Sequence, residues 1–92
     1  MADWRLMGQE RYLQGATLEL RDYEPRSDSW EHDHCEFCQR KFLPARSGDP
    51  GARTRGYTTT AEHERGASYY WVCEDCFADF RERFGWNVAS ET

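Results

Sequence analysis

The segment Tyr70-Trp-Val-Cys-Glu-Asp-Cys-Phe-Ala-Asp-Phe80, together with a second cysteine pair upstream, sets the architecture of this chain. Two residues separate Cys73 from Cys76, and two separate Cys35 from Cys38. Such spacing lets one tight turn present two sulfur atoms to the same ion, and zinc takes four ligands at tetrahedral corners. The sequence therefore predicts one Zn²⁺ per chain on these four cysteines. Four thiolates close the coordination shell, which favours a structural ion over a catalytic one.

The residues after the second pair follow a helical period. Phe77, Phe80 and Phe84 fall on one stripe of a helix that starts near Asp75, and Gly85 is a natural stop. A knuckle, a hairpin and then a cysteine pair entering a helix is the order of parts in a treble-clef zinc finger. The predicted fold class is therefore α+β: a small zinc-stabilised, treble-clef-like domain with a zinc knuckle, a β-hairpin and a C-terminal helix. The nearest competitor is a zinc ribbon, whose second pair lies on a knuckle without a helix.

Upstream of the second pair, three short runs are rich in strand-forming residues. Residues 16–23 alternate between apolar and polar side chains, which predicts a strand with one wet face. Residues 57–60 and 68–72 are predicted to pair as a hairpin. Residues 3–13 are predicted to form a short helix or turn, with Asp3 as its cap.

The chain has 92 residues and a mean hydropathy of −1.01, so its core is small and a metal staple is expected to support it. We predict a single domain over 1–92. Within it, 1–29 form an N-terminal helix/strand extension and 30–88 form the zinc-binding unit. The Pro- and Gly-containing segment 43–56 is predicted to be a flexible loop.

The compartment expected from the sequence is the cytoplasm, because the start of the chain lacks a signal-peptide pattern and no apolar run approaches the roughly 20 residues of a membrane span. In a reducing compartment, paired cysteines are more often metal ligands than disulfides. Disulfides and a redox-active dithiol are the alternatives to zinc. No membrane partner is expected.

The net charge of −5 opposes nonspecific binding to nucleic acids, although the charge is unevenly distributed. Segment 39–56 carries five cations against the single acid Asp49, which leaves open a nucleic-acid-binding zinc finger that uses this basic loop. We favour a solvated loop instead. The five cations are Arg40, Lys41, Arg46, Arg53 and Arg55.

Histidines beside the first cysteine pair raise a further alternative. His32, Asp33 and His34 could form a second, hydrolytic metal site, which would make the protein a metal-dependent enzyme. We favour histidines that orient the knuckle through hydrogen bonds. His63 lies in a polar break and is predicted to be solvated.

The sequence contains no other catalytic constellation, so we predict a protein-interaction or regulatory module rather than an enzyme, with another protein as the partner. The sequence sets no oligomeric state. Large aromatic side chains are the candidate exposed anchors for the partner. The alternative, which we slightly favour for each of them, is that all of them pack in the core. These side chains are Trp4, Trp30, Tyr57 and Trp86.

Four stretches, which cover roughly half of the chain, resemble an uncharacterised family of short bacterial zinc-binding proteins. The two cysteine pairs are the most specific part of this resemblance. It implies zinc and the fold described above, and it implies no reaction. The stretches are Arg5–Leu13, His32–Cys38, Gly56–Thr59 and Tyr70–Phe80.

Overall fold

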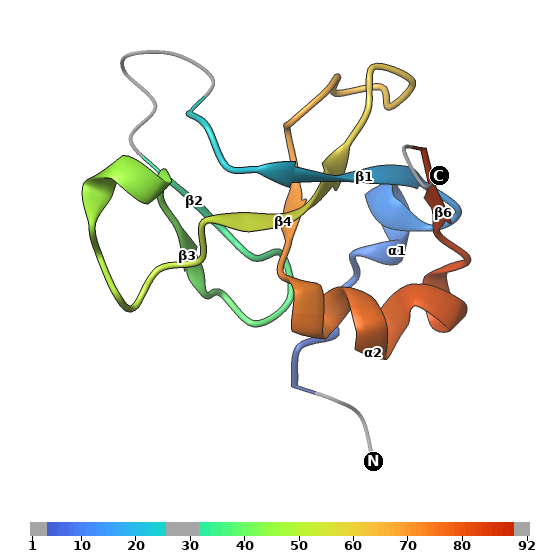
Figure 1. The fold of residues 1–92 in the computed structure, drawn as a ribbon. Coiled ribbons are helices and arrows are strands. Elements are labelled where there is room, and N and C mark those ends of the chain that lie inside the picture. The colour runs from blue at the N-terminus through green and yellow to red at the C-terminus, as the bar shows by residue number, and fades with distance from the viewer. Residues whose placement is uncertain (1–3, 26–31, 90–92) are drawn as a thin grey trace.

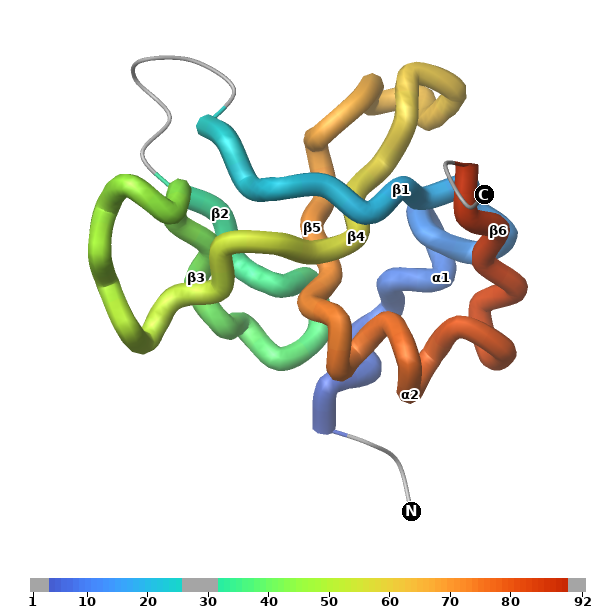
Figure 2. Tube along the Cα trace, viewed as in Figure 1, coloured from blue at the N-terminus to red at the C-terminus, as the bar shows by residue number. Residues whose placement is uncertain are grey.

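A four-stranded sheet occupies the centre of the described chain, which comprises residues 4–25 and 32–89 of this computed structural model (Figures 1 and 2). The strand order is β5-β4-β1-β6; the first three strands pair antiparallel, and β6 runs parallel to β1. β1 therefore lies between a strand from the middle of the chain and one from its end. The strands are β1 (Thr17–Asp22), β4 (Arg55–Thr59), β5 (Trp71–Val72) and β6 (Asn87–Val88).

The strand predicted over 16–23 and the predicted hairpin are both confirmed. In β1, Leu18 is fully buried and lies opposite Thr59 of β4. In the hairpin, Thr58 of β4 lies opposite Trp71 of β5. The long pairing of β1 with β4 and the short parallel pairing with β6 were not predicted, because neither follows from local periodicity.

The C-terminal helix is also confirmed. α2 (Glu74–Phe84) follows β5 after one residue and lies along one face of the sheet, in contact with β4 (Figure 1). Phe77, Phe80 and Phe84 are buried, as the helical stripe predicts. Gly85 ends the helix in a left-handed conformation at φ 66°, and its amide donates to the carbonyl of Arg81.

The helix near the N-terminus is much shorter than the predicted range 3–13. α1 (Glu10–Leu13) has four residues, and turns precede it. Gly8 has a φ of +90°, which a helix does not allow, so the helix cannot extend back through it. The predicted cap, Asp3, lies outside the described residues.

Two aromatic clusters flank the sheet and supply most of the core. Tyr23, Phe42 and Trp71 form the smaller one, with ring centroids 4.9–5.9 Å apart. The larger cluster joins α2 to the knuckle and to the chain after the helix. Its members are Phe37, Tyr57, Phe77, Phe80, Phe84 and Trp86.

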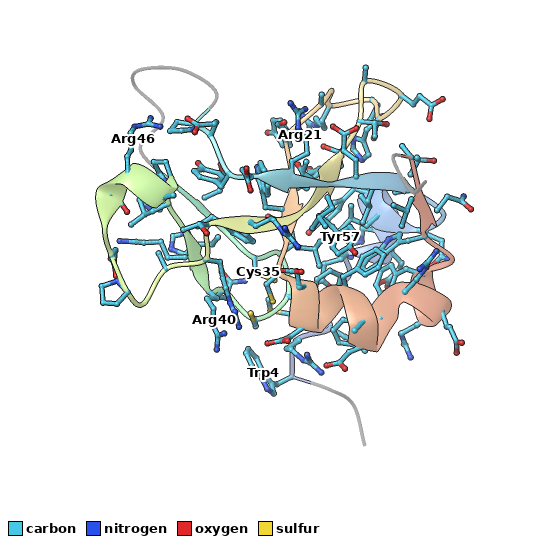
Figure 3. The ribbon with its side chains drawn as sticks, viewed as in Figure 1. Trp4, Arg21, Cys35, Arg40, Arg46 and Tyr57 are labelled. Atoms are coloured by element: carbon cyan, nitrogen blue, oxygen red, sulfur yellow. The ribbon has the colours of Figure 1, made fainter. Side chains whose placement is uncertain are left out.

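The four candidate anchors have different environments. Trp86 is 3% exposed and donates its Nε1–H to the carbonyl of Leu13, so it packs in the core and is not an exposed anchor. Tyr57 is half-buried and stacks on Phe77. Trp4 is 69% exposed, so of the four it remains a candidate anchor, and Figure 3 shows it at the end of the described N-terminal segment, away from the sheet. Trp30 lies outside the described residues.

Residues 4–25, most of the predicted N-terminal extension, share the sheet and the core with the zinc-binding unit, since β1 lies inside the sheet and Leu13 and Tyr23 are buried. Segment 43–56 contains the 3₁₀ helix Ala45–Ser47 and returns along β3 (Lys41–Phe42). There the amide of Arg53 donates to the carbonyl of Lys41, and the carbonyl of Arg53 accepts from the amide of Leu43. No described helix has the length and apolar character needed to cross a membrane.

Candidate metal centre

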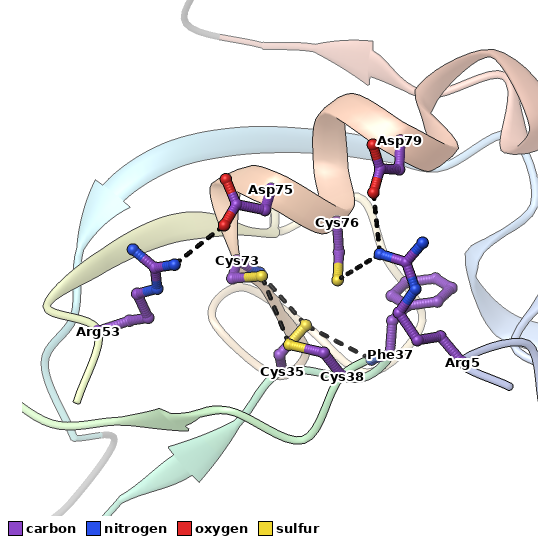
Figure 4. Close-up of polar contacts among 9 residues, drawn as sticks. All are labelled: Arg5, Cys35, Phe37, Cys38, Arg53, Cys73, Asp75, Cys76 and Asp79. Carbon is purple, nitrogen blue, oxygen red and sulfur yellow. Dashed lines mark hydrogen bonds and ion pairs between the residues drawn. The ribbon is translucent and has the colours of Figure 1, made fainter. Parts of the chain in front are cut away.

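The four cysteine sulfur atoms gather at one point between the knuckle and the start of α2 (Figure 4). All of them lie within 4.8 Å of one another, and the Sγ atoms of Cys38 and Cys73 are 3.6 Å apart. A tetrahedral zinc ion with Zn–S bonds of about 2.3 Å requires sulfur atoms about 3.8 Å apart. The observed cluster therefore has the size of a Cys₄ metal shell.

Burial and bonding state agree with a set of ligands. Cys35, Cys73 and Cys76 are at most 1% exposed, and Cys38 is half-buried. All four cysteines are free, so no disulfide joins them. A buried group of four thiols that share one point can hold a soft metal ion.

The first pair lies on a hairpin formed by β2 (Asp33–His34) and β3 (Lys41–Phe42). The amide of Cys35 donates to the carbonyl of Arg40 at 2.8 Å, and the amide of Gln39 donates to the carbonyl of Cys35 at 3.1 Å. Gln39 adopts a φ of 66°, which turns the chain back after the second sulfur. The amide of Phe37 donates to Cys35 Sγ at 3.5 Å, while its ring anchors the turn in the larger aromatic cluster.

The second pair lies at the start of α2, as predicted. Cys73 is the N-cap residue and Cys76 lies in the first turn. The positive end of the helix dipole favours thiolate over thiol at this position. Backbone bonds connect the two halves: the amide of Cys73 donates to Cys35 Sγ at 3.4 Å, and the amide of Glu36 donates to the carbonyl of Trp71 at 2.9 Å.

The pKa values of Cys35 and Cys76 are shifted in opposite directions. Hydrogen bonds from the side chains of Cys73 and Cys76 lower the pKa of Cys35. The same contacts with Cys35 and Cys73, together with burial, raise the pKa of Cys76. Four neighbouring thiolates repel one another, so full deprotonation requires a cation among them. A divalent metal ion supplies that charge.

Several cations of the basic loop form ion pairs with acids on the surface of the protein itself. Arg53 forms an ion pair with Asp75 at 3.0 Å, and Arg55 forms one with Glu74 at 3.6 Å, so two cations contact the acids that lie between Cys73 and Cys76. Arg46 pairs with Glu24 at 2.8 Å. Arg40 and Lys41 are exposed. At least three of the five cations that the nucleic-acid alternative would use for phosphate binding therefore have acidic partners in the protein itself.

The histidine site is not assembled. The rings of His32 and His34 lie 4.9 Å apart, whereas Asp33 accepts a hydrogen bond from the hydroxyl of Tyr23 at 2.8 Å. Among the described residues, only the four cysteines bring three or more metal-binding groups together. Within the same residues, no hydrogen bond links either histidine to a cysteine, so the expected orienting role has no support.

His63 was predicted to be solvated, but both nitrogens of its ring form hydrogen bonds with the protein. Its Nδ1 accepts from the amide of Arg65 at 3.0 Å, so the hydrogen lies on Nε2, which donates to the carbonyl of Tyr12 at 2.7 Å. Both ring nitrogens are therefore used to hold the turn after β4 against α1. This histidine is a structural residue.

Sequence reasoning missed the N-terminal residues that reach the centre. Arg5 Nη1 lies 3.5 Å from Cys76 Sγ, and Gln9 bonds the carbonyl of Glu36, inside the first cysteine pair. The only signal was their place in the stretch Arg5–Leu13 that carries the family resemblance. No local pattern could identify them, because their partners lie 71 and 27 residues away.

Comparisons of the chain with family models, with curated proteins and with solved structures found no match.

Proposed function

We propose that this protein is a zinc-binding protein that holds one Zn²⁺ per chain on Cys35, Cys38, Cys73 and Cys76. The proposal rests on one observation: the four sulfur atoms lie within 4.8 Å of one another although they come from two separate segments. Free thiols in this arrangement match the ligand type and the tetrahedral size that zinc prefers. Iron is the competing ion for a tetrahedral set of four sulfurs.

The role proposed for the ion is structural. Four thiolates leave no position for a bound water, so the ion activates no nucleophile and we assign the protein no catalytic step. The ion instead fastens the knuckle to the start of α2. Structural zinc sites contribute about 10–16 kcal/mol of apparent free energy, which is comparable to the stability of a whole small domain.

We assign the fold to the treble-clef-like class. Support comes from the order of parts: the hairpin of β2 and β3 carries the first pair, the hairpin of β4 and β5 follows, and α2 carries the second pair. A zinc ribbon has no helix at its second pair. β1 and β6 extend the sheet beyond these parts.

Metal analysis of the purified protein tests the zinc site. The expected result is one zinc per chain and little iron by elemental analysis, with the same stoichiometry by native mass spectrometry. Cys35→Ser and Cys76→Ser, one change in each pair, are expected to lose the metal and much of the thermal stability. Glu82→Gln, on the exposed side of α2, is the matched control. Full zinc occupancy in both cysteine variants would refute the site.

The biological role we propose is that of a protein-interaction or regulatory module in the cytoplasm. Trp4 and Met7 support it, since they are 69% and 63% exposed and lie three residues apart in the chain, on either side of Arg5. An immobilised wild-type protein is expected to retain a stoichiometric partner that Trp4→Ala does not retain. Equal recovery with both proteins would exclude this surface.

The nucleic-acid alternative has less support. Arg46, Arg53 and Arg55 already form ion pairs with acids of the protein, and the net charge is −5. A gel-shift titration at low salt with single- and double-stranded probes is expected to show no shift. A salt-dependent shift that is lost on changing Arg40 would favour the alternative.

A further inference from the structure

Arg5 is the charged side chain whose contacts connect the N-terminal segment to the cysteine centre. Its Nη1 lies 3.5 Å from Cys76 Sγ and 2.9 Å from Asp79 Oδ2 (Figure 4). Its guanidinium carbon lies over the ring of Phe80, 4.5 Å from the centroid. The side chain is only 19% exposed. Three different contacts thus hold this guanidinium at the edge of the sulfur cluster.

Hydrogen bonds between the side chain of Gln9 and the backbone hold the segment that carries Arg5. Gln9 is 1% exposed, and its Nε2 donates to the carbonyl of Arg5 at 2.7 Å and to the carbonyl of Glu36 at 2.9 Å. Its Oε1 accepts from the amide of Met7 at 2.7 Å. Tyr12 donates its hydroxyl to the Glu36 carboxylate at 3.0 Å. One buried amide therefore ties the backbone of Arg5 to the turn between Cys35 and Cys38.

The net negative charge of a zinc-loaded cysteine cluster favours a cationic side chain such as Arg5 beside it. Four thiolates and one Zn²⁺ carry a net charge of about −2. Backbone amides of Phe37 and Cys73 donate to the sulfur of Cys35, whereas the sulfur of Cys76 receives the cationic guanidinium. A charge-assisted donor outside the ligand shell orients a ligand and typically changes metal affinity about 10- to 100-fold.

We propose that Arg5 is a positioning residue of the metal centre: it holds the Cys76 thiolate on the ion and slows the release of the metal. The segment 5–9, which we call the strap, thereby docks against the metal centre. Metal binding stabilises the docked strap, and the docked strap stabilises the bound metal. This inference rests on the proposed metal site. The strap also covers the side of the cluster next to α2, from which a chelator would otherwise reach Cys76.

The test measures how fast zinc-loaded protein loses its metal to an excess of a chromogenic chelator, and it records the sulfur-to-metal charge-transfer band of the cobalt-loaded protein. Arg5→Gln is expected to release zinc about 10- to 100-fold faster and to shift the cobalt band. Arg83→Gln, on the exposed side of α2, is the matched control and is expected to match wild type.

Two further variants separate the possible causes. Asp79→Asn removes the ion pair but leaves the contact between Arg5 and Cys76, and it is expected to release zinc more slowly than Arg5→Gln. Arg5→Lys keeps the charge but loses the planar fork, so its rate is expected between those of wild type and Arg5→Gln. It also keeps the test informative if Arg5→Gln does not fold.

The outcomes are distinguishable. A wild-type protein that takes up neither zinc nor cobalt overturns the metal site and this proposal together. Normal uptake by wild type, with an unchanged release rate and cobalt band in Arg5→Gln, overturns this proposal alone. If Arg5→Gln does not fold, a wild-type release rate in Arg5→Lys overturns it.

Discussion

Replacing Gly56 with alanine tests whether the strand next to the metal centre needs a residue without a side chain. Gly56 lies in β4 and is buried. A Cβ atom there would lie 2.7 Å from Phe42 Cε1, 2.8 Å from Phe42 Cζ and 2.8 Å from the carbonyl oxygen of Val72. Neither group can move away easily. The ring of Phe42 packs in the smaller aromatic cluster, and the carbonyl of Val72 belongs to β5, one residue before Cys73.

The expected change in the free energy of unfolding of Gly56→Ala is the sum of two opposing effects. Inserting a methyl group into a packed site costs about 1–3 kcal/mol, and contact with a backbone atom places this site at the upper end. Alanine also makes the unfolded chain less flexible than glycine does, which stabilises the folded protein by about 0.4–1 kcal/mol. The expected net loss is about 2 kcal/mol, which lowers the Tm of a domain of this size by about 10 °C.

The assay is thermal and urea unfolding of the protein at saturating zinc, so that metal loss does not dominate the comparison. Gly51→Ala is the matched control, because a Cβ there meets only Asp49 Oδ1, at 3.4 Å. Its free energy of unfolding is expected to stay within about 0.5 kcal/mol of wild type. If Gly56→Ala proves as stable as Gly51→Ala, the close approach of Phe42 and the β5 carbonyl to β4 is wrong.

Three further predictions concern the knuckle, the core and the metal. Gln39→Gly is expected to raise the free energy of unfolding by about 0.5–1 kcal/mol, because glycine avoids the cost of the left-handed conformation at φ 66°; a loss in chemical denaturation would contradict this. Trp86→Phe removes the 2.8 Å bond to the carbonyl of Leu13 and should lower stability by about 1–2 kcal/mol, whereas unchanged urea unfolding would show that the bond contributes nothing. Acidification should release zinc, since protons compete for the thiolates and the stability from metal binding is lost as the pH falls; a zinc-sensitive dye measures the release, and retention of the ion in acid would argue against thiolate ligands.

Some features of the fold and the site could be predicted because they depend on patterns among residues that are close in the sequence. The stripe of Phe77, Phe80 and Phe84 identified α2, and the alternation around Leu18 identified β1. The spacing of the cysteines identified two turns that each present two sulfurs. Each of these signals spans a few residues and follows directly from backbone geometry.

Other features depend on contacts between distant segments. The basic loop was predicted to be solvated, with phosphate binding as the alternative, and neither pattern indicated that Arg53 and Arg55 contact the acids at the start of α2. Trp86 was weighed both as an exposed anchor and as a core residue, because its local sequence does not decide between the two. Its indole reaches a carbonyl 73 residues away.

The sequence alone predicted the four cysteines as ligands and the metal chemistry they favour, because ligand type and spacing are local properties. Tertiary structure decided how the centre is enclosed. Arg5 meets Cys76 across 71 residues, and Gln9 meets Glu36 across 27. Only the pairing of β1 with β4 and β6, together with the packing of α2 beside them, brings these segments to one place. Such pairings depend on which buried surfaces fit together, and no short-range period encodes that choice.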